Sequence, residues 1–338
     1  MKRLPVETAT GGGMGCASGA GHGAGVAGAA IRLSGSRARL RDARIAGPQP
    51  KPPWLKVKVK QGPNFLELRR LMREHNLHTV CEESGPCPNI YECWEQRTAT
   101  FLILGNVCTR RCTFCDVITG RPPDYDEGEP ERVAKAVAAV GLEYAVVTGV
   151  ARDDIRSDGG ASLWAETIRA IRRHNPDCRV EVLTPDFRGD SDAIRTVVEA
   201  RPDVFAHNLE TVRRIHKDVR KGFDYDRSLE TLRLAKSFRS DQVTKAGLIL
   251  GMGETDDEVR EALCDLKSAR VDLVTLGQYL SPSRAHPVVD RYVTPETFDE
   301  LGAHARSLGF SHVTAGPLVR SSYHAKEQEA AGSATCGM

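Results

Sequence analysis

The sequence predicts an α/β fold: a partial (β/α)6 barrel of the TIM type, preceded by an N-terminal extension and followed by a C-terminal tail. Short runs rich in β-branched residues recur six times from residue 100 onward. Stretches with the apolar spacing of an amphipathic helix lie between these runs. Strands that alternate with helices are joined by crossovers, so they form a parallel sheet with helices outside it.

Each predicted element follows from its local pattern. The strands are expected at 100–104, 144–149, 179–183, 203–208, 245–250 and 272–277. The helices are expected at 129–141, 161–175, 192–200, 227–236 and 255–269. In the first helix, Val133, Val137 and Val140 fall on one face, which indicates a helix that packs against the sheet.

Polar or glycine-rich segments follow the predicted strands. In barrels of this kind the chemistry lies at the carboxyl ends of the strands. Those segments contain "CTRRCTFC", "GVARDDIRSDGG", "TPDF", "NLET" and "GMGET", in that order. The sequence therefore predicts one functional rim.

Composition excludes several classes of function. The chain has 338 residues, 40% of them hydrophobic, which is enough for one large domain or two smaller ones. It contains no apolar run of about 18 residues, so no membrane span is predicted. The net charge of +2, without basic runs interleaved with aromatic residues, argues against nucleic-acid binding.

The first 50 residues differ from the rest of the chain. They are basic and dominated by Gly and Ala, and such a segment buries too little apolar surface to fold, so we expect disorder. The interpretation is a bacterial extension on a cytoplasmic protein. The alternative is a transit peptide to a mitochondrial or plastid matrix. Both compartments are reducing, which favours metal-bound or free thiols over disulfides.

Six of the ten cysteines lie between residues 81 and 115. Cys108, Cys112 and Cys115 have the spacing C-x3-C-x2-C, and three thiolates on one loop hold three corners of a cubane while leaving the fourth iron open. The alternative is a zinc site, since Cys112 and Cys115 form a C-x2-C pair. A structural zinc site needs four ligands, and the chain contains no second such pair. The spacing favours iron–sulfur.

This loop, with Phe114 before its last cysteine, resembles the signature of the radical S-adenosylmethionine superfamily. The segment "GLILGMGE" resembles the motif that this superfamily carries on its fifth strand. The resemblance implies a 4Fe-4S cluster whose open iron binds S-adenosylmethionine and cleaves it to a 5'-deoxyadenosyl radical. The residues it implies as cofactor contacts are Gly149, Asp158, Gly159, Gly160, Asn208, Glu210, Gly251 and Glu254. Turn glycines and helix-capping acids are the alternative interpretation of these positions.

The segment "LHTVCEESGPCPNIYECW" resembles the auxiliary-cluster loop of the lipoyl synthase family, as do "KPPWLK", "LTPDF" and "GPLVRSSYHA" elsewhere in the chain. Cys81, Cys87 and Cys93 are then ligands of a second 4Fe-4S cluster. The family spacing is C-x4-C-x5-C, whereas this chain has one extra residue around Gly85-Pro86, where a turn can absorb it.

The resemblance also implies the missing fourth ligand of that second cluster. It assigns the role to Ser322, with Ser321 the close second, on a tail expected to return over the barrel mouth. The alternative is that both serines only form hydrogen bonds in a turn. Arg110 and Arg111, beside the first cluster loop, are expected either to be solvated or to contact an acidic substrate protein.

The resemblance implies a sulfurtransferase that places two sulfur atoms at carbons 6 and 8 of a protein-bound octanoyl chain, with the second cluster as sulfur donor. Its partners would be octanoylated lipoyl domains, such as the glycine-cleavage H protein and 2-oxoacid dehydrogenase E2 subunits, and a ferredoxin or flavodoxin as electron donor. The alternatives are a methylthiotransferase, a biotin-synthase relative, or a zinc-binding module without redox activity. The expected division of the chain is an extension (1–50), an auxiliary-cluster segment (51–99), the barrel (100–312) and a tail (313–338).

Overall fold

The structure is a computed structural model that describes residues 50–57, 61–74, 77–83 and 87–329. All of them belong to one compact unit that spans Ser36–Met338. The predicted disordered segment lies outside the described residues except for Pro50, as does the Gly85-Pro86 turn.

The centre of the described part is a sheet with the strand order β1-β2-β6-β7-β8-β10-β11-β12. All neighbouring strands are parallel except β1, which is antiparallel to β2. The six predicted strands correspond to β2 (Ala99–Ile103), β6 (Tyr144–Gly149), β7 (Arg179–Leu183), β8 (Val204–Ala206), β10 (Val243–Leu250) and β11 (Leu273–Gln278). The predicted fold class is confirmed.

The sheet extends beyond the prediction at both edges. The added elements are β1 (His78–Thr79), α11 (Pro295–Ser307) and β12 (His312–Gly316). β12 has the sequence "HVTAG", which contains too few apolar residues to predict a strand. It forms because it pairs with β11 from Leu273↔His312 to Gly277↔Gly316. The predicted boundary at residue 312 therefore falls inside a strand, and the segment after the sheet begins at residue 317.

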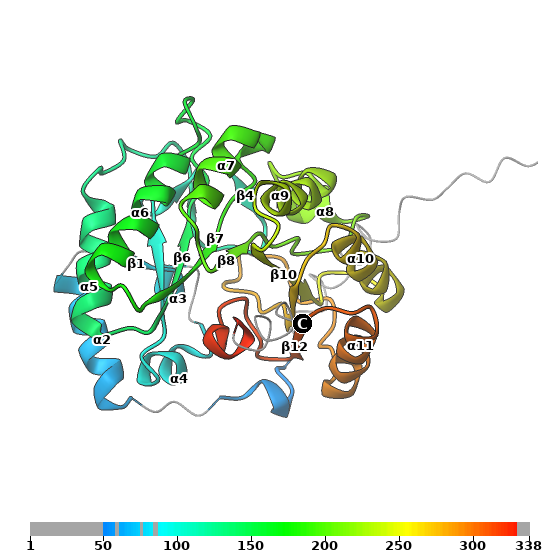
Figure 1. The fold of residues 1–338 in the computed structure, drawn as a ribbon. Coiled ribbons are helices and arrows are strands. Elements are labelled where there is room, and N and C mark those ends of the chain that lie inside the picture. Colours follow the sequence, from blue (N-terminus) through cyan, green and yellow to red (C-terminus); the bar gives the residue numbers. More distant parts are fainter. Residues whose placement is uncertain (1–49, 58–60, 75–76, 84–86, 330–338) are drawn as a thin grey trace, which may run out of the picture. The chain divides into compact units, whose positions relative to one another are not determined.

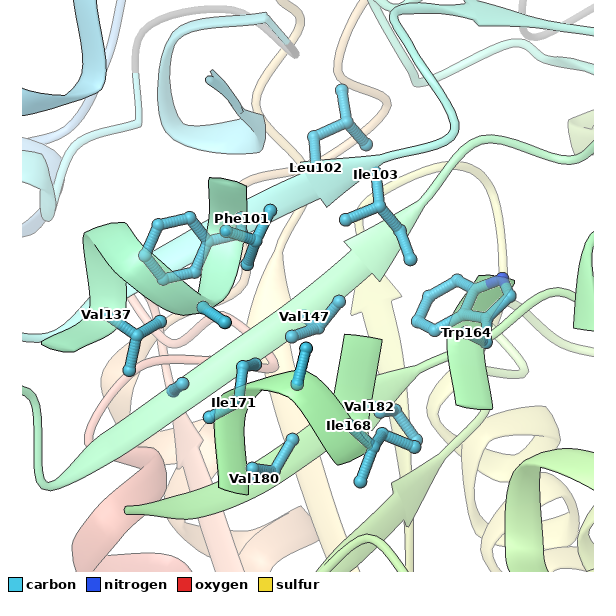
Figure 2. Close-up of a cluster of buried hydrophobic side chains, with 14 of the residues drawn as sticks. Phe101, Leu102, Ile103, Val137, Val147, Trp164, Ile168, Ile171, Val180 and Val182 are labelled. Atoms are coloured by element: carbon cyan, nitrogen blue, oxygen red, sulfur yellow. The ribbon is translucent and has the colours of Figure 1, made fainter. Parts of the chain in front are cut away.

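The predicted helices correspond to α5 (Glu129–Val140), α6 (Ala161–His174), α7 (Ser191–Glu199), α9 (Tyr225–Phe238) and α10 (Asp256–Ser268). They lie outside the strands (Figure 1). Figure 2 shows Phe101, Ile103 and Val147 on the strands facing side chains of α5 and α6, with Trp164 fully buried. A Cβ atom on Gly149 would lie only 2.6 Å from Trp164 Cζ2, so this tight packing requires glycine there.

The interior of the barrel contains a buried polar cluster. Lys245 Nζ lies 2.9 and 3.1 Å from the two carboxylate oxygens of Glu181, and Tyr144 donates a 2.8 Å hydrogen bond to the same carboxylate. All three side chains are buried. A buried charge pair is tolerated when its hydrogen bonds are satisfied, as they are here. The barrel interior thus holds buried charged groups beside its apolar side chains.

The tail fills the amino end of that interior. Residues 325–329 are helical (red in Figure 1). Ala325 packs with Tyr144 and Val146, while Lys326 pairs with Glu143. Arg179, at the start of β7, pairs with Glu329 at 2.9 Å.

The remaining elements are short or lie before the barrel. They are η1 (Pro53–Leu55), α2 (Pro63–Glu74), α3 (Val80–Glu83), α4 (Ile90–Glu95), β3 (Val107–Cys108), β4 (Arg111–Cys112), β5 (Ile118–Thr119), η2 (Phe187–Gly189), α8 (His216–Val219) and β9 (Arg220–Lys221). α2 packs on α4 through Phe65, whose ring centroid lies 5.0 Å from that of Tyr91 and 5.3 Å from that of Trp94. Across the described residues, the helices are too short or too polar to cross a membrane.

Candidate active site

The loop that carries Cys108, Cys112 and Cys115 follows β2 and is held by backbone hydrogen bonds to several parts of the rim. Thr109 N donates to Ala151 O at 3.0 Å, after β6, and Thr113 N donates to Val219 O at 2.8 Å, before β9. β3 pairs with β5, and β4 pairs with β9. The path of this loop is therefore set by the barrel itself.

The thiols of this loop converge. Burial raises the pKa of Cys112 to about 12 and that of Cys115 to about 11, and repulsion between these thiolates and with Cys108 adds to both shifts. Cys108 Sγ accepts hydrogen bonds from the backbone N–H groups of Arg110 and Ala151, both at 3.4 Å. Three neighbouring thiols that resist ionisation are suited to bind metal, because a bound metal deprotonates a coordinating thiol.

Among the described residues, no group of three or more His, Cys, Asp or Glu side chains is arranged around one metal ion. A single zinc ion needs every ligand within about 2.3 Å of one point. A cubane has no such requirement, because each thiolate binds a different iron.

Among the predicted cofactor contacts after β6, the polar groups already have local partners. The Asp158 carboxylate accepts hydrogen bonds from Gly160 N at 2.9 Å and Ser162 N at 2.8 Å, at the start of α6. Gly159 and Gly160 have φ values of 62° and 89°, which favour glycine. These positions and Gly149 thus have structural reasons for their residue types.

Asn208 and Glu210 follow β8 beside β10. The side-chain oxygen of Asn208 is buried and has no hydrogen-bond partner in the described part of the chain, so an acceptor is available there. Burial raises the pKa of the Glu210 carboxyl, and this group interacts electrostatically with Cys112 and Cys115. Glu210 thus lies near the cluster-loop thiols, and Asn208 offers a buried acceptor that a cofactor can use.

The glycine-rich turn after β10 is closed by Glu254. Its buried carboxylate accepts hydrogen bonds from Gly251 N at 2.6 Å and Met252 N at 2.9 Å. A Cβ atom on Gly251 would lie 2.3 Å from Gln278 Nε2, and its φ is 102°. Both predicted residues thus shape the turn.

Arg110 is buried rather than solvated, which corrects one of the two expectations for it. It pairs with Asp153 at 2.7 Å and with the fully buried Asp186. Its guanidinium lies 4.2 Å from the ring centroid of Phe223, and that of Arg220 lies 3.8 Å from the same ring. No local pattern identifies this network, because Asp186 is 76 residues away in the chain. Arg111 is exposed.

Sequence reasoning also missed Arg220 and His286. Arg220 is buried, lies 3.3 Å from His207 Nε2 and donates to Ser228 Oγ at 3.0 Å. Its positive charge opposes the rise in the pKa of Cys112 that burial causes. His286, after β11, lies 3.2 Å from the carbonyl oxygen of Cys115.

The second triplet lies at the other end of β2. Thr98 N, just before that strand, donates to Cys93 O at 2.8 Å, and Cys87 N donates to Cys81 O at 3.3 Å. A hydrogen bond between the Cys81 and Cys87 side chains raises the pKa of Cys81 and lowers that of Cys87 to about 6. Burial raises the pKa of Cys93 to about 12. These thiols therefore also form a group.

The tail contacts α4 and the residue before it, in the segment between Cys87 and Cys93. Asn89 donates to Leu318 O at 2.7 Å, and Tyr323 OH lies 3.3 Å from the Glu92 carboxylate. Ser321 and Ser322 belong to the segment that these contacts bring to the triplet. The tail does not return over the barrel mouth: it passes from the carboxyl end of β12 to Glu143 and Arg179 at the amino ends of β6 and β7. The open edge between β12 and β1 lets it enter the barrel there.

Arg320 interacts electrostatically with Cys87 of the second triplet and with Glu210. Burial lowers its pKa, while the charges of Cys87 and Glu210 oppose that shift. Its backbone neighbour Val319 is so close to β11 that a Cβ atom on Gly277 would lie 2.1 Å from Val319 O. Glu210 in turn interacts with Cys112 and Cys115, so charged side chains span the interior between the triplets.

Comparison with known proteins gives consistent matches. A family model described as the radical SAM superfamily matches residues 102–266, and one described as the N-terminal domain of lipoyl synthase matches residues 37–87. The lipoyl synthase of Mycolicibacterium smegmatis is 58% identical over 275 residues, 81% of this chain and 86% of that relative. The lipoyl synthase of Kocuria rhizophila is 58% identical over 275 residues, 81% of each chain.

Among solved structures, Streptococcus suis SuiB bound to the precursor peptide SuiA matches with a TM-score of 0.52. The identity is 11%, and the match covers 74% of this chain and 52% of that one. This likeness shows the fold.

Proposed function

The chain belongs to the lipoyl synthase family of radical SAM enzymes, and from that premise we propose that it is a sulfurtransferase with two 4Fe-4S clusters. Its reaction places two sulfur atoms at carbons 6 and 8 of a protein-bound octanoyl-lysine. Its substrates are octanoylated lipoyl domains, such as the glycine-cleavage H protein and 2-oxoacid dehydrogenase E2 subunits. It works in the cytoplasm with a ferredoxin or flavodoxin as electron donor.

The observation that carries this proposal is the pair of thiol triplets at opposite ends of β2. One triplet follows the strand on the rim, and the other precedes it at the open edge of the sheet. Glu210 interacts with Cys112 and Cys115, Arg320 interacts with Cys87, and these two charged residues interact with each other. A reaction that needs a radical and a sulfur donor at one substrate chain requires two such centres around one space.

Cys108, Cys112 and Cys115 would hold the cluster that binds S-adenosylmethionine. When bound, the cluster and S-adenosylmethionine together would supply a radical that removes hydrogen from unreactive C–H bonds. The free acceptor of Asn208 and the carboxyl of Glu210 would bind polar groups of the cofactor. Gly149, Asp158, Gly159, Gly160, Gly251 and Glu254 would act mainly by shaping the surrounding turns.

Cys81, Cys87 and Cys93 would hold the cluster that is consumed as sulfur donor, with Ser322 as its fourth ligand and Ser321 as the alternative. The tail contacts to Asn89 and Glu92 support this assignment. An alkoxide is a harder and more readily protonated ligand than a thiolate, so its iron detaches more easily when the cluster loses sulfur.

The decisive experiment incubates the reconstituted, reduced enzyme with S-adenosylmethionine and an octanoyl-lysyl peptide. The expected product, by mass spectrometry, carries two added sulfur atoms. A product with one sulfur or a methylthio group would favour a biotin-synthase-like or methylthiotransferase activity instead. Bound zinc in a colourless protein would contradict the enzyme altogether.

A further inference from the structure

A cavity of about 630 Å³ opens on the carboxyl rim between the loop after β6 and the loop after β7. Arg110 and Ala151 are among the residues that line it. Both donate backbone hydrogen bonds to Cys108 Sγ, so the cavity adjoins the cluster loop. Arg156, from the loop after β6, and Arg188, from the loop after β7, also line it.

The carboxylates that line this cavity already have partners, whereas two of its arginines do not. Asp153 pairs with Arg110, Asp158 accepts from the backbone at the start of α6, and Asp190 accepts from Asp192 N at 2.9 Å at the start of α7. Arg156 and Arg188 are exposed and form no ion pair within the described residues. The cavity therefore offers two guanidinium groups to an anion.

The loop that presents Arg188 has an unusual backbone. Phe187 and Arg188 have φ values of 44° and 57°, in the left-handed region that residues other than glycine seldom adopt. Asp186 holds them there: its buried carboxylate accepts a 3.0 Å hydrogen bond from Arg188 N and pairs with Arg110 and Arg227. Strain maintained by buried ion pairs is typical of positions that serve a function.

We propose that this cavity docks carboxylate side chains that flank the octanoylated lysine of the carrier domain. The proposal rests on the proposed function. Residues 325–329 fill the amino end of the barrel, so the lysine arm enters at the rim, beside Cys108. Acidic residues next to that lysine would then meet Arg156 and Arg188. Paired charges at such a site set the register of the arm and speed association.

The test uses two octanoyl-lysyl peptides that differ only in their flanking residues, Asp and Glu in one and Asn and Gln in the other. We expect the wild-type enzyme to bind the acidic peptide about tenfold more tightly than the amide peptide, a difference in affinity that two partly exposed ion pairs allow. This difference in affinity should shrink at high salt. In the double variant Arg156→Gln/Arg188→Gln the preference should disappear. Binding is measured by fluorescence anisotropy, independently of turnover.

The matched control is the double variant Arg169→Gln/Arg233→Gln on the outer helices α6 and α9, where Arg169 is exposed and Arg233 is half-buried. These changes remove the same charge and should leave the acidic preference intact. The double cavity variant should also bind S-adenosylmethionine as the wild type does. Loss of that binding would assign the cavity to the cofactor and overturn the docking proposal.

The outcomes separate this proposal from the proposed function. Equal binding of the two peptides by the wild type, with sulfur insertion into both, would refute docking and leave the function standing. Tight, salt-sensitive binding of the acidic peptide without sulfur insertion would support docking and contradict the function. A preference that survives in the double cavity variant would place the docking site elsewhere.

Discussion

The two cysteine triplets are held by different means. The loop of Cys108, Cys112 and Cys115 is bonded to neighbouring parts of the barrel rim, through Ala151 and Val219. The segment of Cys81, Cys87 and Cys93 instead depends on the tail, and its hydrogen bond from Asn89 to Leu318 joins residues 229 positions apart. The first site is thus part of the barrel, whereas the second is assembled at the open edge from both ends of the chain. Perturbations should therefore separate the two.

The largest effect is expected at the rim. Cys112→Ala should abolish cleavage of S-adenosylmethionine, because two thiolates cannot hold the cubane with its open iron correctly placed. Formation of 5'-deoxyadenosine in the reduced, reconstituted enzyme measures it. Cys264→Ala, on the exposed side of α10, is the matched control and should cleave as the wild type does. Substantial cleavage by Cys112→Ala would remove this triplet from the radical site.

The second triplet should behave differently. Cys87→Ala should retain formation of 5'-deoxyadenosine while eliminating sulfur insertion, since the rim loop does not depend on it. Iron content and product mass are measured on the same sample. If this variant still produced the dithiolated peptide, the sulfur-donor assignment would be wrong.

Variants of Ser322 test whether the tail supplies a ligand to the second cluster. Ser322→Ala should keep radical formation but lose or slow sulfur insertion by at least about tenfold, an effect equivalent to roughly 1.4 kcal/mol in the barrier. Ser322→Cys should keep an intact but less reactive cluster, because a thiolate releases iron less readily. The paired variant Ser321→Ala decides between the adjacent serines. Full activity in both alanine variants would leave them as turn residues.

Low pH should reduce the stability of the barrel through His207. Burial lowers the pKa of His207 to about 3, below the value of about 6.5 for an unfolded chain. The neutral native histidine therefore contributes stability above pH 6.5 that is lost as the pH falls towards 3, by up to about 1.4 kcal/mol per pH unit. Urea unfolding of the metal-free protein at several pH values measures this slope. His207→Gln should flatten it, and an unchanged slope would show that other groups dominate.

The smallest effect is expected from the N-terminal extension. Deleting residues 1–48 should leave cluster content, cleavage of S-adenosylmethionine and sulfur insertion within about twofold of the full chain. The segment lacks the periodicity of a core-forming element, and it precedes "KPPWLK", where the resemblance begins. Absorbance of the reconstituted protein and product formation are compared with those of the full chain. Loss of either cluster would mean that the extension is an ordered part of the site.

The sequence by itself determined the features that depend on short stretches of chain. Apolar spacing predicted the six strands and five helices because each pattern reflects one face of one element. The spacing of Cys108, Cys112 and Cys115 indicated a cluster loop because all three ligands lie on one turn. The chain's resemblance to the lipoyl synthase family then extended the prediction to Cys81, Cys87 and Cys93.

Only the tertiary structure decided which distant groups meet. The local sequence around Arg110 is compatible with a solvated side chain. In the structure Arg110 is buried because Asp153 and Asp186, from two other loops, form ion pairs with it. β12 forms because β11 offers an unpaired edge, and the tail enters the barrel because the sheet is open between β12 and β1. The cavity with Arg156 and Arg188 likewise exists only where two loops face each other. Such contacts depend on the summed packing of the whole chain, which no local spacing encodes.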